Sequence, residues 1–97
     1  MIFHKGEYYA WIESRGVGSN DLVASSPDSY VSYLKSVSKL IGKDISPELL
    51  STEEDVERVA RSIKGLRAPK TITNYKSAMR QYVAMVRAGI QPKQKSS

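Results

Sequence analysis

The stretch GLRAPKTITNYKSAMRQYVAMV, residues 65–86, carries side chains well suited to binding an anion. It contains Arg67, Lys70, Lys76 and Arg80 but no acidic residue, and hydroxyl and amide side chains stand between these cations. Lysine and arginine displace counterions from phosphates, and Ser, Thr, Asn and Gln donate hydrogen bonds to phosphate oxygens. Asn and Gln can also read adenine edges. The residue types therefore indicate contact with a nucleic-acid backbone.

The distribution of charge along the chain favours the same kind of partner. Residues 1–57 hold all ten acids and five of the bases, whereas residues 58–97 hold the other ten bases and no acid. The net charges of the two parts are thus −5 and +10, which sum to the +5 of the chain. Such an asymmetry between halves indicates contact with nucleic acid or a membrane surface. A solvated surface that is merely lopsided is the alternative reading.

Few residues of this sequence are suited to catalysis or to binding a metal or a cofactor. There is no cysteine, and the single histidine, His4, lies near a terminus, where we expect it at the surface. No glycine-rich phosphate loop and no GxSxG motif occur. The acids at 53–55 are explained by the start of a helix, where they complement the helix dipole. We therefore expect no catalytic residue, no metal site and no cofactor.

The composition also indicates in which cellular compartment the protein is located. The absence of cysteine fits a reducing cytoplasm. No run approaches the eighteen apolar residues of a membrane span, and the apolar faces of the expected helices are needed for a core. We expect a cytoplasmic protein without a membrane partner.

The basic residues must be positioned by helices, because apolar residues recur at helical spacing in four segments. Glycine and proline stand where these segments begin and end. The expected helices are 5–15, 27–41, 52–64 and 69–88, with one further turn at 46–50. The predicted fold class is all-α, a compact bundle of four main helices. Residues 1–90 form a single helical DNA-binding domain in this reading, and residues 91–97 form a flexible basic tail.

The apolar stripes of the two longest helices are expected to face each other and to leave one shared basic surface. The predicted inner residues are Tyr8, Trp11 and Ile12; Tyr30, Val31, Leu34, Val37, Leu40 and Ile41; Val56, Val59, Ala60 and Ile63; and Ile72, Tyr75, Met79, Tyr82, Val83 and Val86. On the second helix, Ser29, Ser32, Lys35, Ser36, Lys39 and Lys43 face away from the stripe. The candidate DNA-binding residues are Ser29, Lys35, Lys39, Arg67, Lys70, Thr71, Thr73, Asn74, Lys76, Ser77 and Arg80.

Four pieces of the sequence resemble, in order, the N-terminal core-binding domain of tyrosine recombinases and phage integrases, which is of SAM-like helical type. They are WIESRGVGS at 11–19, SSPDSYVSYLKSVSKLIG at 25–42, LSTEEDVERVARSI at 50–63 and APKTITNYKSAMRQYV at 68–83. The resemblance covers about four fifths of the chain. It implies that the domain forms half of a clamp around duplex DNA, with the second and fourth helices contacting mainly the backbone. At the positions that match the family, the resemblance implies DNA contacts by Ser29, Lys35 and Lys39 and by Lys70, Thr71, Thr73, Asn74, Lys76 and Arg80.

The expected function is therefore non-catalytic binding of double-stranded DNA, with homo-oligomerisation on DNA as a further option. The catalytic residues of the recombinase family belong to a separate C-terminal domain, and this sequence holds no such set. Two alternatives remain open. One is a DNA-recognition module of a restriction or mobile-element nuclease. The other is a protein–protein adaptor that self-associates through its acidic and basic halves.

Overall fold

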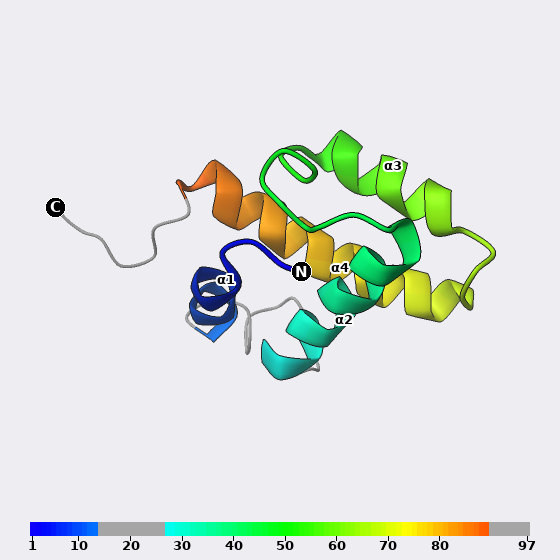
Figure 1. Cartoon of the computed structure of the whole chain (residues 1–97), viewed down its shortest axis with the longest axis horizontal. Coiled ribbons are helices and arrows are strands. Elements are labelled where there is room, and N and C mark those ends of the chain that lie inside the picture. The colour runs from blue at the N-terminus through cyan, green and yellow to red at the C-terminus, as the bar shows by residue number, and fades with distance from the viewer. Residues whose placement is uncertain (14–26, 90–97) are drawn as a thin grey trace, which may run out of the picture.

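Four helices form between the start and stop residues of the sequence. The structure is a computed structural model that describes residues 1–13 and 27–89. Its helices are α1 (Lys5–Trp11), α2 (Pro27–Ile41), α3 (Glu53–Ile63) and α4 (Pro69–Arg87) (Figure 1). Proline opens α2 and α4, because its fixed φ suits the first turn and its missing N–H has no partner there. Within the described residues there is no β-strand, so the all-α bundle of four helices is confirmed.

The helix α4 is one of two central elements of the bundle, since α2 likewise contacts all three other helices. The helix α4 contacts each of the other three helices. In Figure 1, α3 and α4 run antiparallel as a hairpin, α2 crosses α4, and α1 lies near the C-terminal half of α4. This arrangement lets one long helix bury its apolar face against three partners.

Some of the expected elements extend beyond the residues that the structure describes. The end of the expected first helix at 14–15, the Ser26 cap of α2 and the basic tail at 91–97 all lie outside the described ranges. Within those ranges, α1 runs to Trp11, and Ile12 still has helical dihedral angles. His4 is exposed, as expected.

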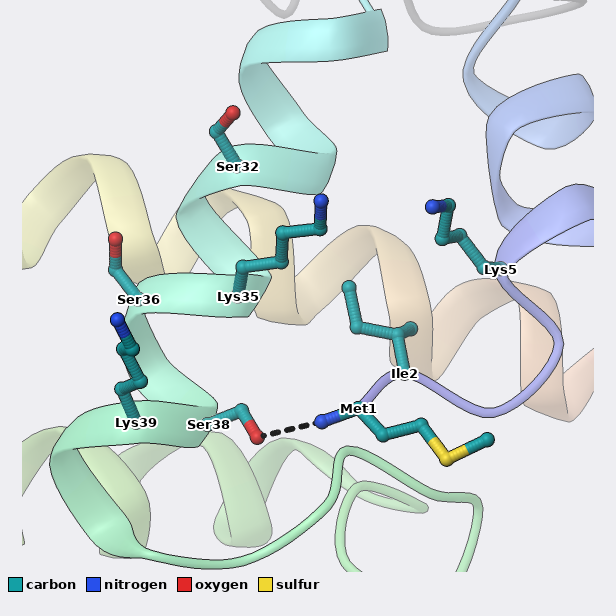
Figure 2. A pocket seen from close by; sticks show the side chains of 8 residues that line it. All are labelled: Met1, Ile2, Lys5, Ser32, Lys35, Ser36, Ser38 and Lys39. Atoms are coloured by element: carbon teal, nitrogen blue, oxygen red, sulfur yellow. Dashed lines mark hydrogen bonds between the residues drawn. The ribbon is translucent and has the colours of Figure 1, made fainter.

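The N-terminal segment is joined to the turn after α2. The Phe3 amide donates to the Ile45 carbonyl at 2.8 Å, and the Ile45 amide donates to the Met1 carbonyl at 2.9 Å. The Met1 ammonium donates to Ser38 Oγ at 3.3 Å (Figure 2). Ser38 Oγ in turn donates to the Lys43 carbonyl at 2.7 Å. These bonds satisfy a buried serine that helical periodicity alone did not assign to the core.

A capping box fixes the start of α3. Thr52 Oγ1 accepts from the Asp55 amide at 3.2 Å, and Asp55 Oδ2 accepts from the Thr52 amide at 3.1 Å. Asp55 Oδ2 also accepts from the amide and the hydroxyl of Ser51, and Asp55 Oδ1 pairs with Arg58. The bonds from Ser51, above all from its amide, and the bond from Thr52 lower the pKa of the Asp55 carboxyl, with a smaller contribution from Arg58. The acids at 53–55 thus have the structural role expected of a helix start.

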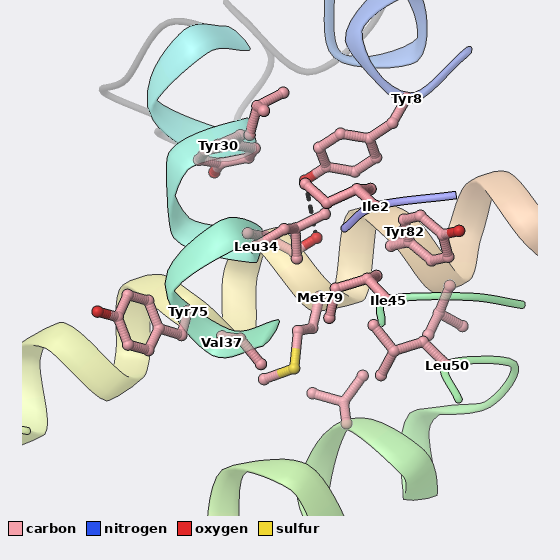
Figure 3. Packing of buried hydrophobic residues seen from close by; sticks show 14 of the residues in the cluster. Ile2, Tyr8, Tyr30, Leu34, Val37, Ile45, Leu50, Tyr75, Met79 and Tyr82 are labelled. Atoms are coloured by element: carbon pink, nitrogen blue, oxygen red, sulfur yellow. Dashed lines mark hydrogen bonds between the residues drawn. The ribbon is translucent and has the colours of Figure 1, made fainter. Parts of the chain in front are cut away.

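The core lies where α1, α2 and α4 meet and extends under α3 (Figure 3). Most of the predicted inner residues are buried, and the structure adds five hydrophobic residues that the periodicity missed: Ile2, Ile45, Leu50, Ala78 and Met85. Leu40 and Ile41 are only partly buried, because they line a groove between α2 and α3. Trp11 is also only partly buried, and its Nε1 donates to Gln81 Oε1 at 3.0 Å.

Tyr82→Phe is expected to destabilise the domain by about 1 kcal/mol at neutral pH, because a buried hydrogen bond is lost. The Tyr82 hydroxyl donates to the Phe3 carbonyl at 2.7 Å and thereby ties α4 to the N-terminal segment. Burial, with lesser contributions from Glu48 and Glu7, raises the pKa of Tyr82 to about 12. Since the folded-state pKa lies above the unfolded value, the contribution of the protonated Tyr82 side chain to stability is complete below about pH 10. It is lost as the pH rises through about 12.

Urea unfolding at pH 8 and at pH 11 measures both effects. The variant should be less stable than the wild type at pH 8 and should lose less stability on going to pH 11. Equal losses in the two proteins would contradict the assignment of alkaline sensitivity to Tyr82.

Candidate nucleic-acid interface

A groove of about 690 Å³ lies between the N-terminal segment and the outer side of α2 (Figure 2). It is lined by Met1, Ile2, Lys5, Ser32, Lys35, Ser36, Ser38 and Lys39. We call it the α2 groove. Lys35 and Lys39 stand four residues apart on α2, so they share one side of the helix. Lys5 reaches the same groove from the start of α1. The arrangement gathers three ammonium groups beside two hydroxyls from Ser32 and Ser36.

No acidic residue of the described ranges lines the α2 groove. Lys35, Lys39 and Lys5 are exposed, and none of them forms an ion pair with any residue in the described ranges. Asp44, which follows α2 in the chain, is paired instead with the Met1 ammonium at 3.3 Å. Three ammonium groups without counter-charges in one groove attract an anion, and the serine hydroxyls can donate hydrogen bonds to its oxygens.

Two of the predicted cations of α4 are, in contrast, paired with acids of α3. Lys76 Nζ lies 3.2 Å from Glu57 Oε2. Arg80 Nε lies 2.9 Å from Glu53 Oε2, and Arg80 Nη2 lies 3.7 Å from Glu57 Oε2. The side chains of Arg80 and Glu53 are 46% and 63% exposed, so these pairs are in contact with solvent. The acids of the first half of the chain thus neutralise part of the predicted basic face.

The α2 groove contains only one of the two predicted sets of basic residues. The apolar faces of α2 and α4 pack against each other, as expected. In Figure 2, α4 passes behind α2, whose Lys35 and Lys39 line the groove. No predicted residue of α4 lines the groove, so the groove itself does not hold both sets. Ser29 is half-buried on α2 and does not line the groove.

The remaining predicted residues lie along the first half of α4. Arg67, Lys70, Thr73 and Asn74 are exposed, and Thr71 and Ser77 are half-buried. Arg67 Nη1 donates to the Leu66 carbonyl at 2.7 Å, and Thr73 Oγ1 donates to the Pro69 carbonyl at 3.1 Å. Neither Arg67 nor Lys70 forms an ion pair with a described residue, and the same holds for Arg61 and Lys64 nearby in the chain. These four cations mark a second basic region at the α3–α4 connection.

Sequence reasoning missed Lys5 as a candidate residue. Lys5 lies thirty positions before Lys35 in the sequence, and only the placement of α1 beside α2 brings the two lysines to one groove. Ser32 and Ser36 had a sequence signal, since they share the outer face of α2 with Lys35 and Lys39. Arg61 and Lys64 also had one, because they belong to the acid-free region after residue 57.

The described residues provide neither a metal site nor a membrane-spanning helix. No three His, Asp or Glu side chains gather in the described residues as a metal ion would require. None of the described helices combines the length and the apolar character needed to cross a membrane.

Fold and site together define a small helical bundle with a lysine-lined surface groove. No family model, curated protein or solved structure matches the chain.

Proposed function

We propose that this chain is a non-catalytic domain that binds the phosphate backbone of double-stranded DNA through the α2 groove. The observation that carries the proposal is the set of three lysines, Lys5, Lys35 and Lys39, gathered around one groove without an acidic partner in the described residues. Each lysine that meets a phosphate releases a condensed counterion, which is the main source of sequence-independent affinity for DNA.

The lining of the α2 groove favours duplex over single-stranded nucleic acid. Binding of single strands relies on aromatic side chains on which successive bases stack. The groove is lined by lysines, serines, Met1 and Ile2, with no aromatic residue among them. The tyrosines Tyr8, Tyr30, Tyr75 and Tyr82 are instead buried in the core. A backbone contact without base stacking is what this lining can supply.

The finer proposal is that the domain is the core-binding half of a tyrosine recombinase or integrase clamp, of SAM-like type. Its support is the order of sequence pieces that resemble that family and their agreement with the bounds of α2, α3 and α4. A recognition module of a nuclease would make the same DNA contacts. The adaptor alternative is less favoured, because Glu53 and Glu57 already pair with Lys76 and Arg80 within the chain, and a second copy would have to displace these cations.

Lys35→Gln/Lys39→Gln is expected to weaken binding to a duplex of about twenty base pairs by roughly 10- to 50-fold at 0.1 M salt. The slope of log K against log salt should become shallower by about 2, because two phosphate contacts are lost. Fluorescence anisotropy of labelled duplex at several salt concentrations measures both quantities. A single-stranded DNA of equal length, which should bind more weakly than the duplex, provides the comparison.

The matched control is Arg58→Gln/Arg87→Gln, which lowers the net charge equally at exposed positions outside both the α2 groove and the second basic region. It should change the affinity by no more than about threefold. A third variant, Arg67→Gln/Lys70→Gln, compares the start of α4 with the groove. If Lys35→Gln/Lys39→Gln binds the duplex as tightly as the wild type, or loses no more affinity than the control variant does, the proposed role of the groove is wrong.

A further inference from the structure

The cations of α4 that pair with acids of α3 are arranged so that they could bind a phosphate group in place of the carboxylates. The guanidinium of Arg80 presents its Nε and Nη2 to two carboxylates, those of Glu53 and Glu57. Lys76 Nζ approaches the same Glu57 Oε2 from the preceding turn of α4. Two cations thus converge on two carboxylates across the α3–α4 contact. Arginine binds carboxylate and phosphate oxygens through the same arrangement of N–H donors.

We infer that Lys76 and Arg80 form a second phosphate-binding site, which the carboxylates of Glu53 and Glu57 keep closed in the free protein. Its ligand is a phosphodiester group of a nucleic acid, and the inference rests on the proposed function. The two glutamates occupy the positions in which phosphate oxygens would otherwise accept from Arg80 and Lys76. The domain would then contact DNA first through the α2 groove. The second site, formed by Lys76 and Arg80, would add to binding only when Glu53 and Glu57 release these cations.

The exposure of the four side chains allows this exchange. Glu57 is 44% exposed and Arg80 is 46% exposed, while Lys76 is more covered at 26%. Ion pairs between side chains in contact with solvent contribute little to stability, so breaking them does not threaten the fold. A polyanion of high charge density gains more from each cation than one carboxylate does, because it also releases condensed counterions.

The site is distinct from the α2 groove. None of the four side chains lines that groove. All four belong to the α3–α4 hairpin, whereas the groove is formed by α1, α2 and the N-terminal segment. The two sites can therefore be changed separately.

Glu53→Gln/Glu57→Gln tests the inference by opening the site while retaining side chains of the same size. We expect this variant to bind duplex DNA about three- to tenfold more tightly than the wild type at 0.1 M salt. The slope of log K against log salt should steepen by about 1 to 2, because one or two further phosphates are contacted. Adding Arg80→Gln to this variant should remove most of the gain. Far-ultraviolet circular dichroism checks that each variant remains folded.

The matched control is Glu48→Gln/Glu54→Gln. It raises the net charge by the same amount, also removes one acid from the first turn of α3, and changes exposed residues that form no ion pair within the described residues. A smaller gain in the control, insensitive to Arg80→Gln, supports a local site. An equal gain in both double variants, or a gain that survives Arg80→Gln, overturns the inference.

The outcomes also separate this inference from the proposed function. If the wild type binds duplex through Lys35 and Lys39 but the glutamate variant gains nothing beyond its control, only the second site is wrong. If neither the wild type nor the glutamate variant binds duplex DNA, both proposals fail together.

Discussion

Leu34→Ala is expected to lower the free energy of unfolding by about 3 kcal/mol. Leu34 is fully buried in the middle of α2, where α2 packs against α1, α4 and the N-terminal segment (Figure 3). Truncation removes the transfer free energy of the deleted atoms and leaves a cavity that the helices fill only in part. A domain of this size has about 5–10 kcal/mol of stability, so the loss is a large fraction of the total.

Urea unfolding followed by circular dichroism and by the fluorescence of Trp11 measures this loss. Trp11 is the only tryptophan, and it contacts α4 through Gln81, so its emission reports on the docking of α1. The melting temperature should fall by about 15 °C. Ser32→Ala on the exposed side of the same helix serves as the control, and its effect should stay within about 0.5 kcal/mol. A loss below about 1 kcal/mol for Leu34→Ala would contradict the central position of α2 in the core.

Asp55→Ala is expected to lower the free energy of unfolding by about 2 kcal/mol at pH 7. The Asp55 carboxylate accepts hydrogen bonds from the Ser51 amide, the Ser51 hydroxyl and the Thr52 amide. Its removal leaves these donors at the start of α3 without their acceptor and opens the capping box. The helix that carries Glu53 and Glu57 would then fray at its first turn.

The same prediction has a pH dependence with a definite sign. Because the hydrogen bonds lower the folded-state pKa of Asp55 below its unfolded value of 3.8, the stabilisation is present above that value. It is lost as the pH falls through the folded-state pKa. The difference in stability between wild type and Asp55→Ala should therefore be full at pH 6 and should shrink below about pH 4. Glu54→Ala, which changes a neighbouring exposed acid, is the control. A difference that is constant from pH 6 to pH 2 would show that the carboxylate does not act through its charge.

The helices were largely predictable from the sequence, because their signals are local. Pro27 and Pro69 open α2 and α4, and Thr52 with Asp55 caps α3, as their positions indicated. Helical spacing also identified most of the core, including Tyr8, Leu34 and Met79. Residues such as Ile45 and Leu50 were missed because they lie in a connection without periodicity, and only the packing of that connection buries them.

The candidate site was predictable only in part. The sequence determined that cations and hydroxyls gather on the outer side of α2 and along α4, because a helix fixes which residues share a face. It could not determine which face of one helix meets which face of another, since that depends on contacts between residues far apart in the chain. The tertiary structure decided that Lys5 joins Lys35 and Lys39 around one groove. It decided equally that Glu53 and Glu57 neutralise Lys76 and Arg80, because the α3–α4 hairpin brings opposite charges within a few ångströms.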